Sequence, residues 1–529
     1  MSQIVCSVPP GLSVIWCGKE QRCRDLLVFE TFVRQGQRAR FPKLPSVASF
    51  SSRHAIDVIG QGVKLLLVTW LFLAILAGGL PALAQPAQLP ALPTSGSQPT
   101  QASSGWLEQN YLLDGFNGER SRLENEGFAF IPIYTAETFG NPIGGVKQGA
   151  IYEGLLDLEL TLDFKKMADW DGTFHVSSYY PMGNGLTGSD THDLLVVSNI
   201  DAYDTLHLFE LWYEQKFWDD KVALRVGQMG ANTEFFISNG STDFLAGTYG
   251  WPGILASNAP TPNYAYAAPG IRLQLDPDEH WRFLGAVYAG NPAPDRVGDP
   301  NPNRASSDDF NNSGTGFYIN GSQGLFNINE LWYKLNREDN ATGLPGTYKI
   351  GGWLHTDTFS DKRYDDHGIS LASPASDGHP RAVGGNSGFY VVADQAVWHD
   401  KSDPKQIKEI DLFFRGGNAL GDRSVFDYYL DGGVTFNGLI PGRSADYFGI
   451  ATAYGHIGSG LQGFTEDQNS FNGTNLPIPD FEQNIEVTYL AQVAPWWTVQ
   501  PDMQIIIHPG GSAAIPNAVV LGCRTTITF

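Results

Sequence analysis

The side chains best suited to chemistry in this chain are charged residues that recur at the polar positions of alternating segments. Guanidinium groups donate hydrogen bonds and carboxylates accept them, so the two together suit a hydroxyl-rich solute. Binding to such groups must stay weak if the solute is to move on. The sequence therefore predicts a set of residues that line a solute path: Arg225, Arg272, Arg282, Arg415, Arg524, Asp157 and Glu159.

Other roles remain open for these charged residues. Most of them would merely hydrate a wall if infolded loops formed the narrowest point, and arginines alone would serve an anion as well as a neutral solute. One aromatic candidate, Trp353, lies on the same side as the charges if Ile350 and Leu354 face outward. Its ring would stack against the C–H groups of a hydroxyl-rich solute, and a place in an aromatic belt at a membrane surface is an equally good prediction.

Motifs for catalysis or metal binding are absent from the sequence. It contains no H-E-x-x-H, G-x-S-x-G or C-x-x-C, and its histidines are scattered singly. Gly183-Asn-Gly-Leu-Thr-Gly188 matches a dinucleotide-binding pattern, but no amphipathic helix follows it, so we interpret it as a loop. A glycosidase with paired carboxylates is a less favoured alternative, because no nucleophile motif supports it. We therefore predict no enzyme, no cofactor and no metal.

Cysteine content and net charge exclude further classes of protein. Only Cys523 lies outside the first few dozen residues, so neither a disulfide nor a thiolate metal site can form in the body of the chain. The formal net charge of −22 argues against nucleic acid as a partner, because binding to phosphates requires basic residues.

The elements that must position the charged candidates are β-strands. In Leu156-Asp-Leu-Glu-Leu-Thr-Leu-Asp-Phe164, apolar residues alternate with polar ones, which places each kind on its own face of a strand. Similar alternation occurs at 222–226, 271–275, 485–489 and 519–529. A soluble β-sandwich produces the same pattern, so the alternation by itself predicts only an all-β fold.

The connections between strands distinguish a barrel from a sandwich. Those after every second strand are short, such as 218–220 and 276–280, whereas most of the others are long. Short periplasmic turns and long extracellular loops are typical of transmembrane antiparallel β-barrels, which have an even number of strands in bacteria. We therefore predict such a barrel with about sixteen strands. The predicted strands are 128–138, 149–164, 173–180, 205–217, 221–228, 263–275, 281–289, 325–335, 346–357, 386–398, 406–416, 425–435, 445–455, 480–492, 497–507 and 518–529.

Aromatic residues stand near the predicted short turns. Glu210-Leu-Trp-Tyr213 and Glu330-Leu-Trp-Tyr333 come late in strands that lead to such turns, and Trp496-Trp497 flanks another. They predict an interfacial belt in contact with outer-membrane lipid, with aromatic pairs in a soluble core as the alternative. The last segment, Thr525-Thr-Ile-Thr-Phe529, resembles the signal that the barrel-assembly machinery reads, so we expect that machinery to be a partner.

The first part of the chain carries an export signal. Lys64 precedes an apolar run and Ala82-Leu-Ala84 supplies a cleavage sequence, so residues 63–84 are predicted to be a signal peptide. The run is too short for a membrane anchor, which needs about 20 apolar residues. Residues 1–62 are predicted to be untranslated or unstructured, and 85–105 to be a disordered tether rich in Pro, Gln and Ser. The barrel domain then comprises 106–529 and begins with a short predicted helix at 120–126, with Leu123 on the barrel rim.

Several segments resemble the OprB family of carbohydrate-selective porins. The most specific is Tyr489-Leu-Ala-Gln-Val-Ala-Pro-Trp-Trp-Thr-Val-Gln-Pro-Asp-Met-Gln504 followed by His508-Pro-Gly-Gly511, which is similar to the family's closing hairpin. Asp114-Gly-Phe-Asn-Gly118 and Glu210-Leu-Trp-Tyr-Glu-Gln215 resemble earlier parts of the family. The resemblance implies a sixteen-stranded barrel in the outer membrane of a Gram-negative bacterium, which passes monosaccharides such as glucose into the periplasm. A general or anion-selective porin is the alternative.

Overall fold

The computed structural model describes residues 106–113, 119–202, 204, 206–292, 323–337, 341, 343–400 and 408–529. The predictions for residues 1–105, namely the untranslated stretch, the signal peptide and the tether, lie outside the described residues. No helix in the described part of the chain is both long and apolar enough to cross a membrane.

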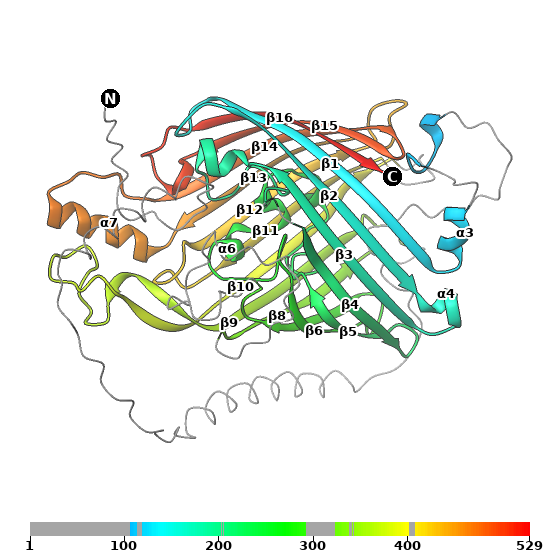
Figure 1. The fold of residues 1–529 in the computed structure, drawn as a ribbon, viewed down its shortest axis with the longest axis horizontal. Helices are drawn as coiled ribbons and strands as arrows, with labels where there is room; N and C mark the ends of the chain where they lie inside the picture. Colours follow the sequence, from blue (N-terminus) through cyan, green and yellow to red (C-terminus); the bar gives the residue numbers. More distant parts are fainter. Residues whose placement is uncertain are drawn as a thin grey trace, which may run out of the picture. The chain divides into compact units, whose positions relative to one another are not determined.

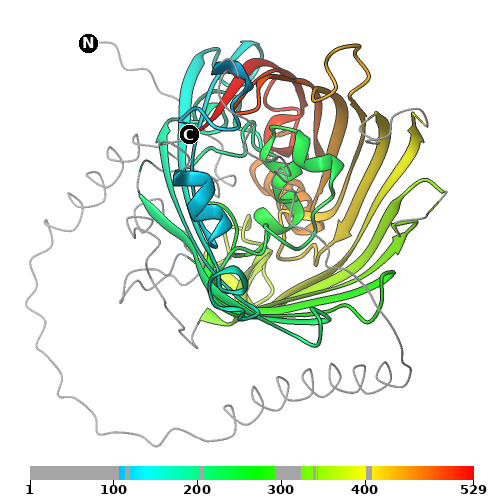
Figure 2. The same cartoon turned by 90° about the vertical axis from the view of Figure 1, so that its right-hand side faces the viewer.

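Sixteen antiparallel strands close into one barrel, in which each strand pairs with its neighbours in sequence and the last pairs with the first (Figure 1, Figure 2). The strands are β1 (Phe128–Ile143), β2 (Ala150–Asp163), β3 (Gly172–Gly183), β4 (His207–Phe217), β5 (Val222–Met229), β6 (Ala268–Leu275), β7 (Trp281–Ala289), β8 (Leu325–Leu335), β9 (Gly346–Asp365), β10 (Pro380–His399), β11 (Glu409–Asn418), β12 (Phe426–Asn437), β13 (Tyr447–Ile457), β14 (Phe481–Ala494), β15 (Trp497–Ile507) and β16 (Ala518–Thr528). The predicted fold class and strand order are confirmed.

Some strand boundaries differ from the prediction. β1 continues to Ile143 and β9 to Asp365, while β10 already begins at Pro380. The longer β9 and β10 form a hairpin that extends beyond the neighbouring strands (Figure 1). β6 begins only at Ala268, because the residues before it belong to a loop inside the barrel.

Alternation separates the two faces of the barrel as the sequence predicts. In β5, Leu224 and Val226 are exposed on the outer face, while Ala223 and Arg225 are buried on the inner face. Such an apolar outer face contacts lipid in a transmembrane barrel. Exposed apolar side chains on other strands include Ile271, Val287, Ile350, Val391, Leu412, Leu430 and Leu521.

The aromatic belt contains only some of the predicted residues. Tyr213 and Tyr333 lie on the outer face, since their register partners across the sheet are Val226 and Trp281, which are exposed. Trp212 and Trp332 point into the barrel instead, because neighbouring residues of a strand point to opposite faces. Trp496 is also buried, against Trp106. Each predicted Trp-Tyr pair thus contributes its tyrosine alone to the belt.

The connections alternate in length along most of the barrel. The short ones at 218–221, 276–280 and 495–496 leave from the end of the barrel that also holds the start of β1 and the end of β16. We call this the short-turn end. The opposite end carries the longest connections, although 144–149 is short there too. Helix α4 (Phe164–Ala168) occupies a connection of the short-turn end, and α7 (Ser459–Asn472) one of the opposite end.

Helix α3 (Glu119–Asn125) confirms the short helix predicted before the first strand. Leu123 lines an apolar cavity at the barrel rim together with Phe128 and Phe130 of β1.

Two long connections turn inward and occupy the barrel interior (Figure 2). The first infolded loop comprises the described residues of 184–206, with the one-turn helix η4 (Thr187–Thr191). The second infolded loop, residues 230–267, holds the short helices η5 (Gly240–Asp243), α5 (Gly247–Gly250) and α6 (Gly253–Ala256).

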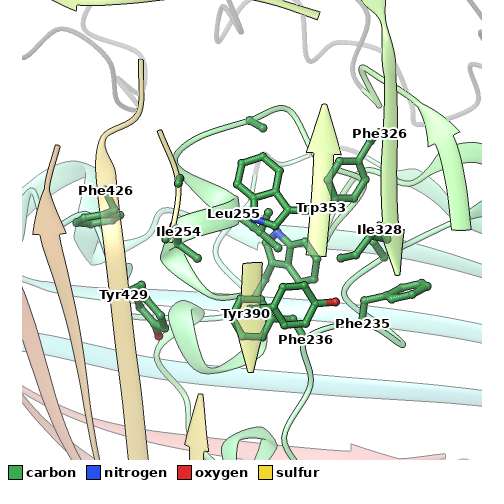
Figure 3. Packing of buried hydrophobic residues seen from close by; sticks show 14 of the residues in the cluster. Phe235, Phe236, Ile254, Leu255, Phe326, Ile328, Trp353, Tyr390, Phe426 and Tyr429 are labelled. Atoms are coloured by element: carbon green, nitrogen blue, oxygen red, sulfur yellow. The ribbon is translucent and has the colours of Figure 1, made fainter. Parts of the chain in front are cut away.

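The hydrophobic core of the protein lies between the second infolded loop and the inner wall. Phe235, Phe236 and Leu255 of the loop are fully buried and belong to one cluster with Trp353 and Tyr390 of the wall (Figure 3). The rings of Phe236 and Tyr390 stack with centroids 4.0 Å apart. The interior of the barrel is therefore packed with side chains of the loop and of the wall.

The two infolded loops also bind each other through their backbones. Gly247 N donates to Val196 O at 2.8 Å, and Asn199 N donates to Leu245 O at 2.8 Å. The two infolded loops are therefore joined to each other as well as to the wall.

Candidate functional site

Arg225 and Arg272 face each other across β5 and β6 and share two carboxylates. Glu214 of β4 accepts from Arg225 Nε at 3.1 Å and from Arg272 Nη2 at 2.7 Å. Glu234, in the second infolded loop, lies 2.6 Å from Arg272 Nη2 and 3.4 Å from Arg225 Nη1. Two positive and two negative charges thus balance one another in a largely buried network.

Glu234 is the member of this network that belongs to a loop rather than to the wall. Burial tends to raise the pKa of its carboxyl, but the neighbouring Arg225 and Arg272 hold the pKa below its ordinary value. The carboxylate is therefore ionised at neutral pH. An ionised Glu234 ties the loop to the wall by charge-assisted hydrogen bonds, which are stronger than neutral ones.

Arg415 of β11 is fully buried, with 0% of its surface exposed, and also holds the second infolded loop. Its Nη2 donates to Asp431 Oδ2 at 2.7 Å. The same guanidinium donates to Phe236 O at 3.0 Å and to Thr248 O at 3.1 Å. Arg415 therefore joins β11, β12 and the loop.

The remaining two predicted arginines also face carboxylates. Arg524 Nε donates to Glu137 Oε2 at 2.6 Å, and its Nη2 donates to Asn199 of the first infolded loop at 2.7 Å. Arg282 Nε and Nη2 bind the two carboxylate oxygens of Asp276, each at 2.6 Å. Each of the five predicted arginines is thus paired with a carboxylate.

Two acidic residues of β14 that sequence reasoning missed anchor the loops as well. Glu482 Oε1 accepts from Leu194 N and Leu195 N, both at 2.7 Å. Glu486 accepts from Leu245 N at 2.5 Å and from Ala246 N at 2.9 Å. The strict alternation of Ile485-Glu-Val-Thr-Tyr489 does predict that Glu486 faces inward, but nothing local to it shows which backbone it binds.

The two Glu-Leu-Trp-Tyr segments build the same arrangement on the inner wall. Trp212 Nε1 donates to Glu210 Oε2 at 3.1 Å, and the Arg225 guanidinium lies 3.7 Å from the Trp212 ring centroid. In the second copy, Trp332 Nε1 donates to Glu330 Oε2 at 2.5 Å, and Lys349 Nζ lies 3.8 Å from the Trp332 ring centroid.

Each of these glutamates also holds the second infolded loop. Glu210 Oε1 accepts from Gly230 N at 2.8 Å, and Glu330 Oε1 accepts from Phe236 N at 2.5 Å. The repeated tetrapeptide is the sequence feature that indicates these inner-wall residues. Its alternation puts Glu and Trp on one face of the strand and Leu and Tyr on the other.

The other predicted site residues occupy two different settings. Asp157 and Glu159 are half-buried on the inner face of β2, opposite Tyr179 and Ser177 of β3. Trp353 is only 4% exposed and packs in the core cluster, so it lies neither in the aromatic belt nor with an open ring face (Figure 3).

The inner wall therefore offers paired charges and tryptophan rings around a loop unit that narrows the barrel. Paired charges place hydrogen-bond donors and acceptors side by side, which suits a hydroxyl-rich solute. The described residues contain no group of three or more His, Cys, Asp or Glu side chains placed to hold a metal ion.

Comparison with known proteins places this geometry among porins. The family model described as "Carbohydrate-selective porin, OprB family" matches residues 147–529. The chain is 25% identical over 470 residues to Porin B of Pseudomonas aeruginosa, covering 82% of this chain and 94% of that protein. It is 23% identical over 468 residues to the putative porin QuiX of Acinetobacter baylyi, covering 82% of this chain and 97% of that protein. The high-pH structure of Pseudomonas putida OprB superposes with a TM-score of 0.70 at 22% identity, over 80% of this chain and 100% of that chain.

Proposed function

Because this chain belongs to the OprB family of carbohydrate-selective porins, we propose that it passes monosaccharides of the glucose type into the periplasm by facilitated diffusion. The protein is a carbohydrate porin of the outer membrane, and its family and fold are those of a channel rather than of an enzyme. The identity of the sugar and the residues that contact it are the proposed part.

The observation that supports a small neutral sugar is the pairing of charges along the inner wall. A sugar hydroxyl both donates and accepts, so it can exchange hydrogen bonds with a guanidinium and a carboxylate that stand side by side. Arg282 with Asp276 offers such a pair. An anion would instead need arginines whose charge is not already balanced, so the anion-selective alternative is not favoured.

We propose that the sugar passes beside the second infolded loop and contacts Trp332 and the half-buried carboxylates Asp157 and Glu159. Trp332 is less buried than Trp212, and its ring lies on the inner face of β8. Aromatic rings suit the C–H faces of pyranoses, and contacts of this kind are weak enough for release. Arg225, Arg272, Arg415 and Arg524 act in this proposal mainly by holding the loops that set the width of the path.

Single-channel recording tests the proposal. The purified protein is reconstituted in planar bilayers, and current is measured with and without millimolar glucose. We expect a steady conductance that glucose reduces and that a disaccharide reduces less. Channels indifferent to every sugar would leave a general porin, and a protein that forms no channels would overturn the proposed transport.

A matched pair of variants tests the residue assignment. Trp332→Ala removes an inward ring, whereas Tyr333→Ala removes the neighbouring outward one. We expect Trp332→Ala to weaken the block by glucose and Tyr333→Ala to leave it unchanged. Equal loss in both variants would mean that the effect comes from general disturbance of β8 and would contradict the assignment.

We also propose how the protein reaches the membrane. Residues 63–84 direct export, the barrel-assembly machinery reads the segment Thr525–Phe529, and the outer apolar belt then contacts lipid. The alternation of β16 and the exposed Leu521 on its outer face support this order. Sequencing the N-terminus of the mature protein tests the first step, and Gln85 is the expected first residue.

A further inference from the structure

The described residues before β1 lie at the short-turn end, beside the seam where β1 pairs with β16 (Figure 1). They comprise residues 106–113, with the one-turn helix η2 (Trp106–Glu108), and helix α3. We call these residues the rim segment. Apart from Trp106, they take no part in the contacts described above for the belt or the inner wall.

Backbone and arginine contacts fasten the rim segment to both sides of the seam. Leu112 N donates to Thr528 O at 2.9 Å. Arg120 donates to the main-chain oxygen of Phe529, and its Nη2 donates to Phe130 O of β1 at 3.2 Å. One guanidinium thus binds the last strand and the first strand at once.

The Arg120 side chain is held in place by its neighbours. Its guanidinium carbon lies 3.3 Å from the ring centroid of Tyr111, and its Nε donates to Glu124 Oε1 at 3.1 Å. The side chain is 12% exposed, whereas that of Arg122 in the same helix is 53% exposed and pairs with Glu119 and Glu126. Arg120 is therefore the arginine of α3 that contacts the barrel.

An aromatic contact extends the attachment to the turn before β15. The rings of Trp106 and Trp496 lie 4.7 Å apart, and Trp496 Nε1 donates to Trp106 O at 3.3 Å. Trp496 O in turn accepts from Thr528 N at 2.9 Å. The rim segment thereby touches β1 and β16 and the turn that leads into β15.

We propose that the rim segment is a clasp that locks the β1–β16 seam after the barrel has closed. Arg120 and Phe529 are 409 residues apart in sequence, so their contact can form only when the last strand has reached the first. The seam is the place where a barrel can open to expose unpaired strand edges, which are costly in lipid. Contacts that exist only in the closed barrel slow its opening, because they must break first.

Hydrogen exchange on the full-length protein in lipid tests the clasp. Arg120→Ala removes the link to both strands, and Arg122→Ala is the matched control in the same helix. We expect amides of 525–529 and of Leu112 to exchange about tenfold faster in Arg120→Ala, because loss of a charge-assisted contact favours local opening. Exchange should be unchanged in Arg122→Ala, and single-channel conductance should be unchanged in both variants.

A second variant keeps the test decisive if Arg120→Ala does not fold. Trp106→Ala removes the aromatic contact with Trp496 and leaves Arg120 in place, and we expect a smaller rise in exchange at 525–529. If Arg120→Ala folds and exchanges like Arg122→Ala, or if Trp106→Ala leaves exchange at 525–529 at the wild-type rate, the clasp is wrong.

Discussion

The two Glu-Leu-Trp-Tyr segments, on β4 and β8, build the same arrangement but differ in what surrounds it. In both, a glutamate accepts from the tryptophan two residues later and from a backbone N–H of the second infolded loop. The β4 copy stands in an ionic network, since the cation over Trp212 is Arg225, which also binds Glu214 and Glu234.

In the β8 copy, the charged residues bind neutral partners more often than in the β4 copy. Lys349, the cation nearer to the Trp332 ring, donates to the main-chain oxygen of Ile237 at 2.6 Å, and Glu330 also accepts from Tyr390 at 2.9 Å. The same tetrapeptide can therefore belong to a network of balanced charges or anchor a loop through neutral groups. Which of the two occurs depends on the partners that distant strands supply.

Removing Glu330 or Glu210 should produce the largest loss in the free energy of unfolding, and the two losses should differ. Glu330→Ala leaves Phe236 N and the Trp332 and Tyr390 donors without their acceptor in a buried setting, so we expect a loss of about 3 kcal/mol in the free energy of unfolding. Glu210→Ala should cost about 2 kcal/mol, because its contacts from Trp212 and Thr233 are longer. Urea-induced unfolding in vesicles, followed by tryptophan fluorescence, measures both. Equal losses would erase the proposed difference between the two copies.

Neutralising Glu234 should change the charge of the β4 network without removing a wall residue. Glu234→Gln leaves Arg225 and Arg272 with one carboxylate between them, so we expect the channel to become more selective for anions. Reversal potentials in a KCl gradient measure this shift. Asp357→Asn, on β9, is the control for general loss of a negative charge, and a shift of the same size there would contradict a special role for Glu234.

Acid should reproduce the effect of Glu234→Gln in the unmodified protein. The pKa of Glu234 is lowered in the folded state, so its contribution to loop anchoring is fully present above the ordinary glutamate pKa and is lost as pH falls through the lowered value. The part of the rise in anion selectivity that depends on Glu234 should therefore appear only at strongly acidic pH, and Glu234→Gln should lack this part.

Asp243, in the same loop, should respond to pH in the opposite direction. Burial and the nearby Asp411 raise the pKa of Asp243 to about 7. A raised pKa means that the folded state holds the proton more tightly, so this group stabilises the loop at low pH and the stabilisation fades as pH rises through about 7. Asp243→Asn should make hydrogen exchange of the loop less dependent on pH between about 4 and 7. An unchanged pH dependence would rule out Asp243 as its source.

The strands could be predicted because their signal is local. Leu156–Phe164 alternates at every position, since its apolar residues lie on the outer face of the barrel and its polar residues on the inner face. The same alternation places Trp212 and Trp332 on the inner face, so the prediction that these two residues belong to the aromatic belt was wrong.

The loop anchors could not be predicted from the sequence. Leu194 and Glu482 are 288 residues apart, and Arg415 and Phe236 are 179 residues apart. The second infolded loop has no period that indicates its inward course, and its position depends on partners contributed by many strands. Sequence reasoning therefore found the arginines but not the loop contacts that most of them make.

The smallest expected effects come from exchanging the cation over each tryptophan ring, Arg225 in the β4 copy and Lys349 in the β8 copy. Arg225→Lys loses hydrogen bonds that a guanidinium makes from Nε and Nη2 and that one ammonium group cannot replace, so we expect a loss of about 1.5 kcal/mol. Lys349→Arg keeps a donor for Ile237 O and a cation over Trp332, so about 0.5 kcal/mol is expected. The same urea titration measures both. If Lys349→Arg proved the more damaging change, the β8 copy would be the one that depends on the identity of its cation, and the contrast between ionic and neutral anchoring would have to be reversed.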